Sequence, residues 1–182
     1  DELIKLFWEN WDKCGQPAKC RREKLDAPAG GVGTMSVTVS AISGFTSRRS
    51  FAANYRHAIE QARDYVYMTN AYFVPGRRVT RGLVRAARRG VKVSVIVPGQ
   101  ADVPFVRTAS WALYARLLSA GVEIYEWLPG ILHAKTCVVD GIWSSVGSHN
   151  LDSRSLYHNE ELNINVYDSG IGESLRQMFE ND

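Results

Sequence analysis

A short run between residues 133 and 150 contains the side-chain types that phosphate chemistry requires. His133 and Lys135 are two residues apart, so on a strand they point to the same face and bring an imidazole and an ammonium group together. Ser148 and Asn150 have the same spacing and are expected on a neighbouring strand or at its end. One titratable nitrogen, one positive charge, a hydroxyl and an amide suit a bound anion that must be attacked. Phosphate is the obvious candidate.

The surrounding sequence predicts alternating strands and helices that would hold this run in place. Alternating and β-branched apolar residues predict strands at 34–42, 64–69, 91–97, 122–126, 133–139, 142–147 and 161–167. Apolar residues at helical spacing predict helices at about 48–63, 77–89, 105–119 and 171–180. This order predicts an α/β fold, with a mixed, largely parallel β-sheet flanked by helices.

The N-terminal part is predicted to lie outside this domain. Residues 1–12 place apolar and aromatic side chains at helical spacing, and residues 13–33 are polar and rich in glycine and proline. We therefore expect a helix at 1–12 that ends a preceding domain, a linker at 13–33 and the main domain at 34–182. In an alternative interpretation the helix lies on a membrane surface. The start at Asp1 rather than Met suggests a piece of a longer protein.

Composition narrows the function classes only modestly. The 182 residues are 45% hydrophobic and 23% charged, which is ordinary for a globular domain. The net charge of +3 is too small to indicate nucleic acid as a partner. The three cysteines fit neither a disulfide framework nor a zinc site, and they favour a reducing, cytoplasmic compartment. No apolar run is long enough to span a bilayer.

The central run resembles the HKD motif of the phospholipase D superfamily, which reads here His133-x-Lys135-x4-Asp140 and then Gly147-Ser148-x-Asn150. The flanks are similar to those of bacterial cardiolipin synthases at residues 150–155, at Asn159-x-Glu161 and at residues 70–75. This resemblance extends from about residue 37 to the end of the chain. It implies a phospholipase D-like α/β/α sandwich that forms one HKD half.

The resemblance implies a phosphatidyltransferase built from two such halves, of which this chain is similar to the second. The superfamily transfers a phosphatidyl group in two steps through a phosphohistidine. In cardiolipin synthases, two phosphatidylglycerols give cardiolipin and glycerol, with no metal or other cofactor. The implied partners are phosphatidylglycerol, an anionic phospholipid at the membrane surface, and a second HKD half, in the same chain or by homodimerisation. The implied location is membrane-associated, on the cytoplasmic side.

The resemblance also assigns roles to single residues. His133 and Lys135 form the catalytic pair, and His133 is the general acid and base opposite a nucleophilic histidine of the other half. The reverse assignment, with His133 as nucleophile, stays open. The phosphate oxygens are contacted by Lys135, Ser148 and Asn150.

Two acidic residues complete the expected site. Glu161 is expected to accept a hydrogen bond from a motif histidine and so to fix its tautomer. Asp140 belongs to the motif and is counted with the catalytic residues. Its position on an Asp140-Gly141 turn nevertheless favours a structural hydrogen-bonding role over contact with substrate.

Other features leave alternatives open. The chain could be a phospholipase D-like phosphodiesterase or nuclease that acts as a single-motif homodimer, and only then is nucleic acid a partner. The six arginines at 77–89 form either a solvated helix face or a surface for anionic lipid headgroups. The remaining histidines, His57, His149 and His158, lie outside the motif and are not expected to be catalytic.

Overall fold

The computed structural model describes residues 2–13, 33–42, 45–100, 111, 113–152 and 159–182, with the backbone alone for residue 2 and for residues 45–50. The chain divides into two units, residues 1–35 and residues 36–182. Most of the predicted linker, part of the predicted helix at 105–119, and His158 lie outside the described residues. The domain assignment of the two units stays a prediction.

The first unit contains the amphipathic helix α1, Glu2–Lys13. Its aromatic side chains form a cluster in which the Phe7 and Trp11 rings stack at 5.5 Å, with Trp8 edge-on to both. Leu3 and Phe7 remain exposed. The helix predicted from the spacing of apolar residues is therefore present.

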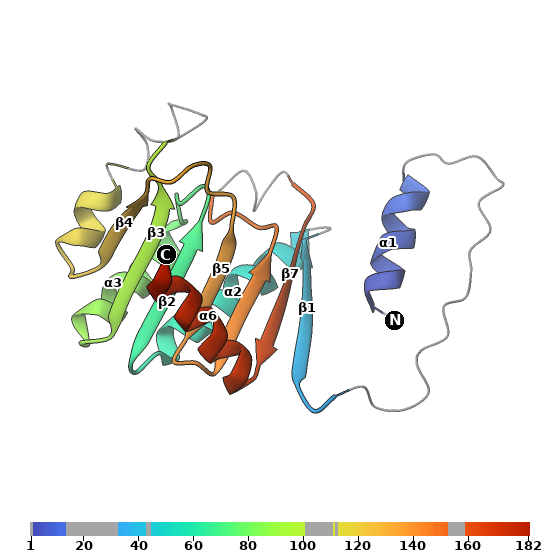
Figure 1. Ribbon diagram of the computed structural model, residues 1–182. Helices are drawn as coiled ribbons and strands as arrows, with labels where there is room; N and C mark the ends of the chain where they lie inside the picture. Colours follow the sequence, from blue (N-terminus) through green and yellow to red (C-terminus); the bar gives the residue numbers. More distant parts are fainter. Residues whose placement is uncertain (1, 14–32, 43–44, 101–110, 112, 153–158) are drawn as a thin grey trace. The chain divides into compact units, whose positions relative to one another are not determined.

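In the described part of the second unit, seven strands form one sheet in the order β1-β7-β6-β5-β2-β3-β4 (Figure 1). Their bounds are Ser36–Ile42, Tyr65–Asn70, Lys92–Pro98, Glu123–Trp127, Lys135–Val139, Trp143–Gly147 and Glu161–Tyr167, for β1 to β7 in turn. The neighbours β2, β3 and β4 are parallel. The other pairs, from β2–β5 to β1–β7, are antiparallel. The predicted mixed sheet flanked by helices is confirmed.

Helices cover both faces of this sheet. On one face lie α2, Phe45–Gln61, and α3, Arg77–Arg88, and on the other lies α6, Ser169–Asn181 (Figure 1). The alternation along β2 explains this arrangement, because successive side chains point to opposite faces. Val66 and Met68 belong to the large core under α2 and α3, whereas Tyr67 belongs to a smaller cluster that includes Phe179 of α6.

One predicted element begins later than expected, at the position that matters most. The strand expected at 133–139 starts at Lys135, so His133 lies in the irregular segment before β5. The prediction that His133 and Lys135 share a strand face is therefore wrong. The Ala134 carbonyl still accepts the Ala71 N–H at 3.2 Å, but the ladder between β2 and β5 begins at the pair Asn70 and Lys135. The other described strands begin and end within two residues of their predicted bounds.

The arginines of α3 lie on its outer side, opposite the buried residues Val79, Leu83 and Ala86. At the end of the helix, the Arg89 guanidinium donates hydrogen bonds to three carbonyl oxygens at the C-terminus of α2, those of Ile59, Glu60 and Ala62. The last carbonyls of a helix lack i+4 partners, and of these three only that of Ile59 also accepts a local backbone bond in the described part of the chain, from the Ala62 N–H at 3.4 Å. Arg89 therefore caps the end of α2 from outside that helix. At least one arginine of the predicted stripe thus has a structural role.

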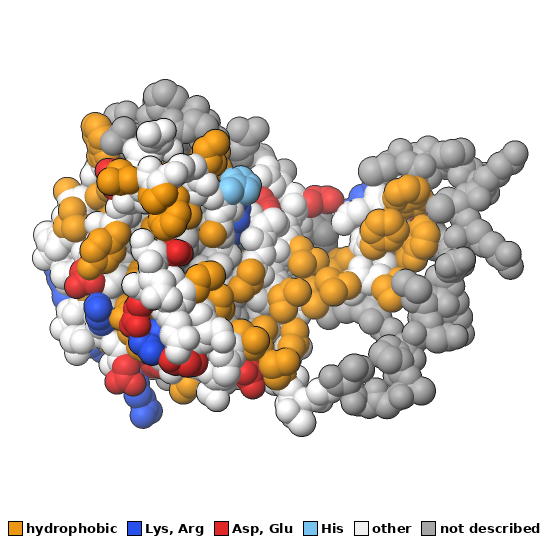
Figure 2. All heavy atoms as spheres, viewed as in Figure 1, with side chains coloured by type: hydrophobic (Ala, Val, Ile, Leu, Met, Phe, Trp, Pro, Cys, Tyr) orange, Lys and Arg blue, Asp and Glu red, His pale blue; other side chains and the backbone are white. Residues whose placement is uncertain are grey.

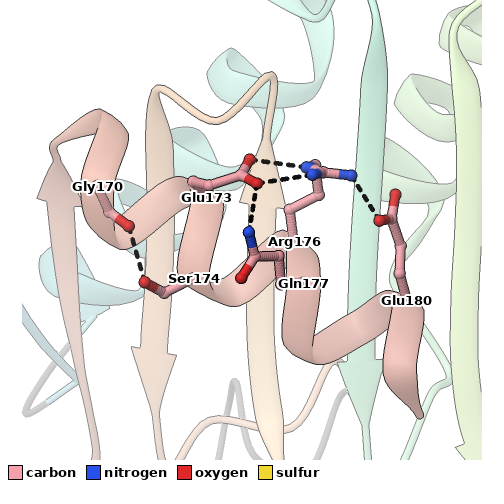
Figure 3. Close-up of polar contacts among 6 residues, drawn as sticks. All are labelled: Gly170, Glu173, Ser174, Arg176, Gln177 and Glu180. Atoms are coloured by element: carbon pink, nitrogen blue, oxygen red, sulfur yellow. Dashed lines mark hydrogen bonds and ion pairs between the residues drawn. The ribbon is translucent and has the colours of Figure 1, made fainter.

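Helix α6 begins at the N-cap Asp168, whose carboxylate accepts the Ile171 N–H. Along its exposed side, Arg176 bridges Glu173 and Glu180 (Figure 3). Hydrogen bonds from Arg176 and Gln177 lower the pKa of Glu173 to about 2. These groups are solvent-exposed, so we expect them to add little to stability. No helix among the described residues is long and apolar enough to cross a membrane.

Candidate active site

Three segments converge at the edge of the sheet where β2 ends and β5 begins. The strand register places Asn70, the last residue of β2, opposite Lys135, the first residue of β5. The Asn70 side chain accepts the Leu151 N–H at 3.1 Å, and the Leu151 carbonyl accepts the Val74 N–H at 2.9 Å. The segment after β6 is therefore fastened to the end of β2. Carboxyl ends of parallel strands commonly hold ligands in α/β proteins.

Lys135 carries a buried positive charge at this edge. Its side chain is only 6% exposed, and its ammonium donates a 2.7 Å hydrogen bond to the backbone carbonyl of His133. Burial lowers the pKa of Lys135, and the nearby Glu161 carboxylate opposes that shift. A buried cation is costly unless it is paired, and here the His133 carbonyl and the Glu161 carboxylate offset part of that cost. An ammonium group held in this way can also bind a phosphate oxygen.

His133 has an exposed side chain directly before β5. Lys135 and His133 are brought together by the lysine side chain folding back onto the His133 carbonyl, and not by strand alternation. This contact fixes the backbone of the histidine, whose side chain is exposed. An exposed imidazole next to a fixed ammonium is suited to proton transfer to a charged substrate.

Ser148 and Glu161 form a hydrogen-bonded pair beside Lys135. The Ser148 hydroxyl donates to one oxygen of the Glu161 carboxylate at 2.5 Å, and the Asn159 amide donates to the other oxygen at 3.0 Å. The Ser148 N–H and hydroxyl also bind the backbone of Leu162. Among the described residues, the hydrogen-bond partners of Glu161 are therefore Ser148 and Asn159, and no histidine is among them. Its role in orienting a histidine stays a prediction.

The turn after β6 is shaped by one glycine and two asparagines. A Cβ at Gly147 would collide with the Leu162 carbonyl and with Asn163. The Asn163 side chain accepts the His149 N–H at 3.2 Å and so holds the next residue in place. Asn150 is buried, and its side-chain amide oxygen Oδ1 has no hydrogen-bond partner among the described residues. A buried unpaired polar atom suggests a position completed by a ligand or by another part of the protein.

Asp140 is the one motif residue that the structure places elsewhere. It follows β5 at the opposite end, about 17 Å from Lys135 for five strand residues. Its carboxylate accepts three backbone N–H bonds of 2.8–3.0 Å, from Arg63, Asp64 and Tyr65. It therefore fastens the start of β2 to the β5–β6 turn, which is the structural role that its turn position favoured.

His149 is buried against α2 and does not share the exposure of His133. Its ring lies 4.1 Å from that of Phe51, and neither ring nitrogen has a hydrogen-bond partner among the described residues. Burial lowers the pKa of His149 to about 4, against the attraction of Glu161 and Asp152. The side chain is therefore neutral at pH 7, which agrees with its expected non-catalytic status.

This burial predicts a loss of stability in acid. The pKa of His149 is near 6.5 when the chain is unfolded and about 4 when it is folded, so its contribution is complete above pH 6.5 and is lost as the pH falls through 4. We expect the wild type to lose about 3 kcal/mol more unfolding free energy than His149→Phe between pH 7 and pH 4. Urea unfolding at both pH values measures the difference. Equal losses in the two proteins would contradict the prediction.

Two positioning residues were not identified from the sequence. Asn70 and Asn163 both accept backbone N–H bonds from the turn after β6. Asn163 also donates to the Tyr55 hydroxyl of α2 and to Ser145. The available signal was an asparagine alternating with aliphatic residues in a strand, because a polar residue on a buried face needs partners. No group of three or more His, Cys, Asp or Glu side chains in the described ranges could hold a metal ion.

Solved structures share this fold. A phospholipase D family member, Nuc from Salmonella typhimurium, superposes with a TM-score of 0.69 at 22% identity, over 81% of this chain and 93% of that one. NucT from Helicobacter pylori gives 0.66 at 16% identity, over 81% and 95% of the two chains. Phosphatidylserine synthase from Haemophilus influenzae gives 0.58 at 16%, over 80% and 39%.

Relatives found by sequence identify the family of this chain more narrowly than the shared fold does. Cardiolipin synthase A from Yersinia pseudotuberculosis and from Yersinia pestis is 46% identical over 121 residues, which is 66% of this chain. The chain spans about a quarter of the length of these curated relatives, 25% in each case. The profile of the family described as "Cardiolipin synthase, PLD-like domain" matches residues 55–182. The resemblance to the phospholipase D superfamily and to bacterial cardiolipin synthases is thus confirmed. The chain belongs to the phospholipase D-like domain family of cardiolipin synthase.

Proposed function

We propose that this domain is one half of a phosphatidyltransferase that condenses two phosphatidylglycerols to cardiolipin and glycerol through a phosphohistidine. The observation that carries the proposal is the buried Lys135 ammonium bonded to the backbone of His133, in a chain 46% identical to Cardiolipin synthase A over 121 residues. The family, the fold and the positive charge at the sheet edge all support it.

The chemical problem is that a phosphodiester repels nucleophiles through its own negative charge. A positive group fixed before the reaction starts lowers this barrier, and more so as charge develops on the phosphoryl oxygens in the transition state. Lys135 meets this requirement, because its ammonium is already desolvated and held at 2.7 Å from a backbone carbonyl. The Ser148 hydroxyl lies at the same edge and is held by Glu161.

The proposed reaction has two displacements. A histidine nitrogen of the other HKD half attacks phosphorus, and a P–N bond forms. The P–O bond to glycerol breaks as His133 donates its proton to the departing oxygen. The terminal hydroxyl of the second phosphatidylglycerol then attacks phosphorus. His133 removes the hydroxyl proton and the P–N bond breaks. Two steps retain the activated phosphorus for an alcohol acceptor. Glu161 is proposed to orient the histidine of the other HKD half.

The other HKD half is needed because the first displacement uses two histidines in different roles. One imidazole cannot be nucleophile and leaving-group acid in the same step, and His133 is the one described histidine at this edge with an exposed side chain. The other half is supplied by the same chain or by another copy. Its docking explains why one part of the sheet is incompletely covered.

The incompletely covered part is a face of β1, β7 and β6. Helix α6 packs across β2, β5 and β6. On the side away from α2, the strand register sets aliphatic side chains next to one another, and each is only partly buried or exposed. They are Val37, Val39, Ala41, Val146, Leu162, Ile164 and Val166. Contiguous exposed apolar surface of this kind commonly marks an interface, and Leu162 directly follows Glu161 of the site.

The proposal is tested with a protein that carries this domain together with a second HKD half. With phosphatidylglycerol vesicles and a metal chelator, we expect cardiolipin and glycerol in equal amounts, measured by mass spectrometry and an enzymatic glycerol assay. The 182-residue chain as a monomer should release no glycerol. Metal-independent cleavage of DNA by a dimer of the chain, without lipid transfer, would instead support the nuclease alternative.

A further inference from the structure

We propose that residues 128–132, named here the apolar loop, penetrate the lipid surface that presents the substrate. The loop connects β4 to the site. Its sequence is Leu-Pro-Gly-Ile-Leu, and it contains no charged residue. The choice of a lipid as the partner rests on the proposed function, whereas the exposure of the loop and the anchoring of its two ends are properties of the structure itself.

Two side chains of the loop, those of Leu128 and Ile131, are unusually exposed for aliphatic residues. Ile131 is 89% exposed and Leu128 is 71% exposed, the two highest fractions among the large hydrophobic side chains that the structure describes. Connecting loops are normally polar, with Gly, Pro, Asn, Asp and Ser predominating. Single exposed aliphatic residues are common, but two such residues at the tip of one short loop form a projection that water disfavours.

The base of the loop is held firmly. Trp127 ends β4, where it pairs with Pro98 of β3, and its carbonyl accepts the Gly99 N–H at 2.9 Å. At the other end, Leu132 is partly buried against the cluster that contains Tyr67 and Phe179. The loop is therefore anchored at both ends, while Leu128 and Ile131 remain largely exposed. Such preorganisation reduces the entropy lost when the tips become ordered in a second medium.

The loop is adjacent to the reacting centre. Ile131 is two residues before His133, and β5 begins at Lys135 two residues later. Figure 2 shows exposed hydrophobic side chains at this end of the second unit, among others spread over the same face. A phosphatidylglycerol whose phosphate is bound beside His133 keeps its acyl chains in the bilayer. The surface next to His133 must therefore lie at the level of the membrane interface, which is where the apolar loop projects.

The composition of the loop favours lipid over a protein partner. Protein interfaces concentrate their energy in Trp, Tyr and Arg side chains, which the loop lacks. Two aliphatic tips without hydrogen-bonding groups match the acyl boundary of a bilayer, because burial there requires no polar complementarity. The site itself adds the positive charge of Lys135 for an anionic headgroup.

The test is binding of the 182-residue chain to phosphatidylglycerol vesicles, measured by co-sedimentation over a range of lipid concentrations. We expect Leu128→Ser and Ile131→Ser each to weaken binding about tenfold, and the double variant about 100-fold. Ile142→Ser is the matched control, because Ile142 is 64% exposed in the β5–β6 turn at the opposite sheet edge. It should bind like the wild type.

Three results would overturn the proposal. They are an absence of binding by the wild type, wild-type affinity in the double variant, and an equal loss in Ile142→Ser. Sedimentation velocity adds a further readout. If the loop variants abolish self-association of the chain and leave vesicle binding unchanged, the loop is a protein interface and the lipid proposal is wrong.

Failure of the loop proposal can be told apart from failure of the proposed function. In a protein with both halves, the loop variants should lose transfer on bilayers but retain it on short-chain phosphatidylglycerol below its critical micelle concentration. Equal transfer by the wild type and the variants on bilayers would reject the loop proposal alone. If the wild type makes cardiolipin from neither substrate form, the proposed function fails, whatever the vesicle binding shows.

Discussion

Replacing His133 with alanine should reduce cardiolipin formation by at least about a thousandfold in a protein that carries both HKD halves. Loss of a general acid and base alone accounts for about 10²–10⁴ in rate. Because His133 would act in both displacements, we expect an effect in the upper part of this range. The measurement is initial glycerol release from phosphatidylglycerol vesicles, with the unfolding free energy checked in parallel. The exposed position of His133 predicts little loss of stability.

His57 provides the matched control, because it is also an exposed histidine but lies on α2. His57→Ala should keep full activity. Full activity of His133→Ala would refute the assignment of the site. The same variant distinguishes acid from nucleophile: a phosphodiester with a p-nitrophenol leaving group needs no proton donor. The first-turnover burst of p-nitrophenol should be retained if His133 is the acid, because only the second displacement then needs His133, and it should be lost if His133 is the nucleophile.

The second large effect is expected at Asp140, on stability and not on chemistry. Its carboxylate accepts N–H bonds from Arg63, Asp64 and Tyr65, and its own backbone has a φ of 52°. Alanine would leave these donors without an acceptor, and it would keep a Cβ at positive φ without the side-chain hydrogen bonds that compensate for this conformation in Asp140. We expect Asp140→Ala to lose about 2–4 kcal/mol of unfolding free energy, discounted for the exposure of two of the three bonds.

Urea unfolding measures this loss, and two further variants serve as a conservative replacement and as a control. Asp140→Asn retains an acceptor oxygen and tolerates positive φ, so it should lose about half as much. Asp64→Ala is the control, because its side chain is exposed at the same corner. Activity per folded molecule should be unchanged in all three. A severe loss of activity in stable Asp140→Asn would restore a catalytic role for this residue.

Much of the fold could be predicted from local patterns. The alternation at 161–167 predicts β7 with its observed bounds, because a half-buried strand repeats its environment every second residue. The arginine and valine pattern predicts α3, which ends where Gly90 takes a φ of 92°. The types and spacing of His133, Lys135, Ser148 and Asn150 also predict phosphate chemistry before any partner is known. These inferences depend on neighbours in sequence, so the sequence suffices.

What the sequence could not predict depends on contacts between distant segments. The hydrogen bond from Ser148 to Glu161 could not be predicted, because the register in which β6 pairs with β7 brings these two residues together. The expected hydrogen bond from a motif histidine to Glu161 stays a prediction. The same register makes Asn163 a support of the turn after β6. Neither consequence can be inferred from spacing, since a shift of one residue would change every partner.

The sequence alone determined that this chain has an α/β sheet and one histidine–lysine pair suited to phosphate transfer. Only the tertiary structure decided how that pair is held. It places His133 before β5 and not on it, it uses Asp140 to fasten the far end of β5 to β2, and it leaves Leu128 and Ile131 projecting beside the site. The physical reason is that periodicity specifies which face a residue occupies, while burial, exposure and hydrogen-bond partners are decided by which strands become neighbours.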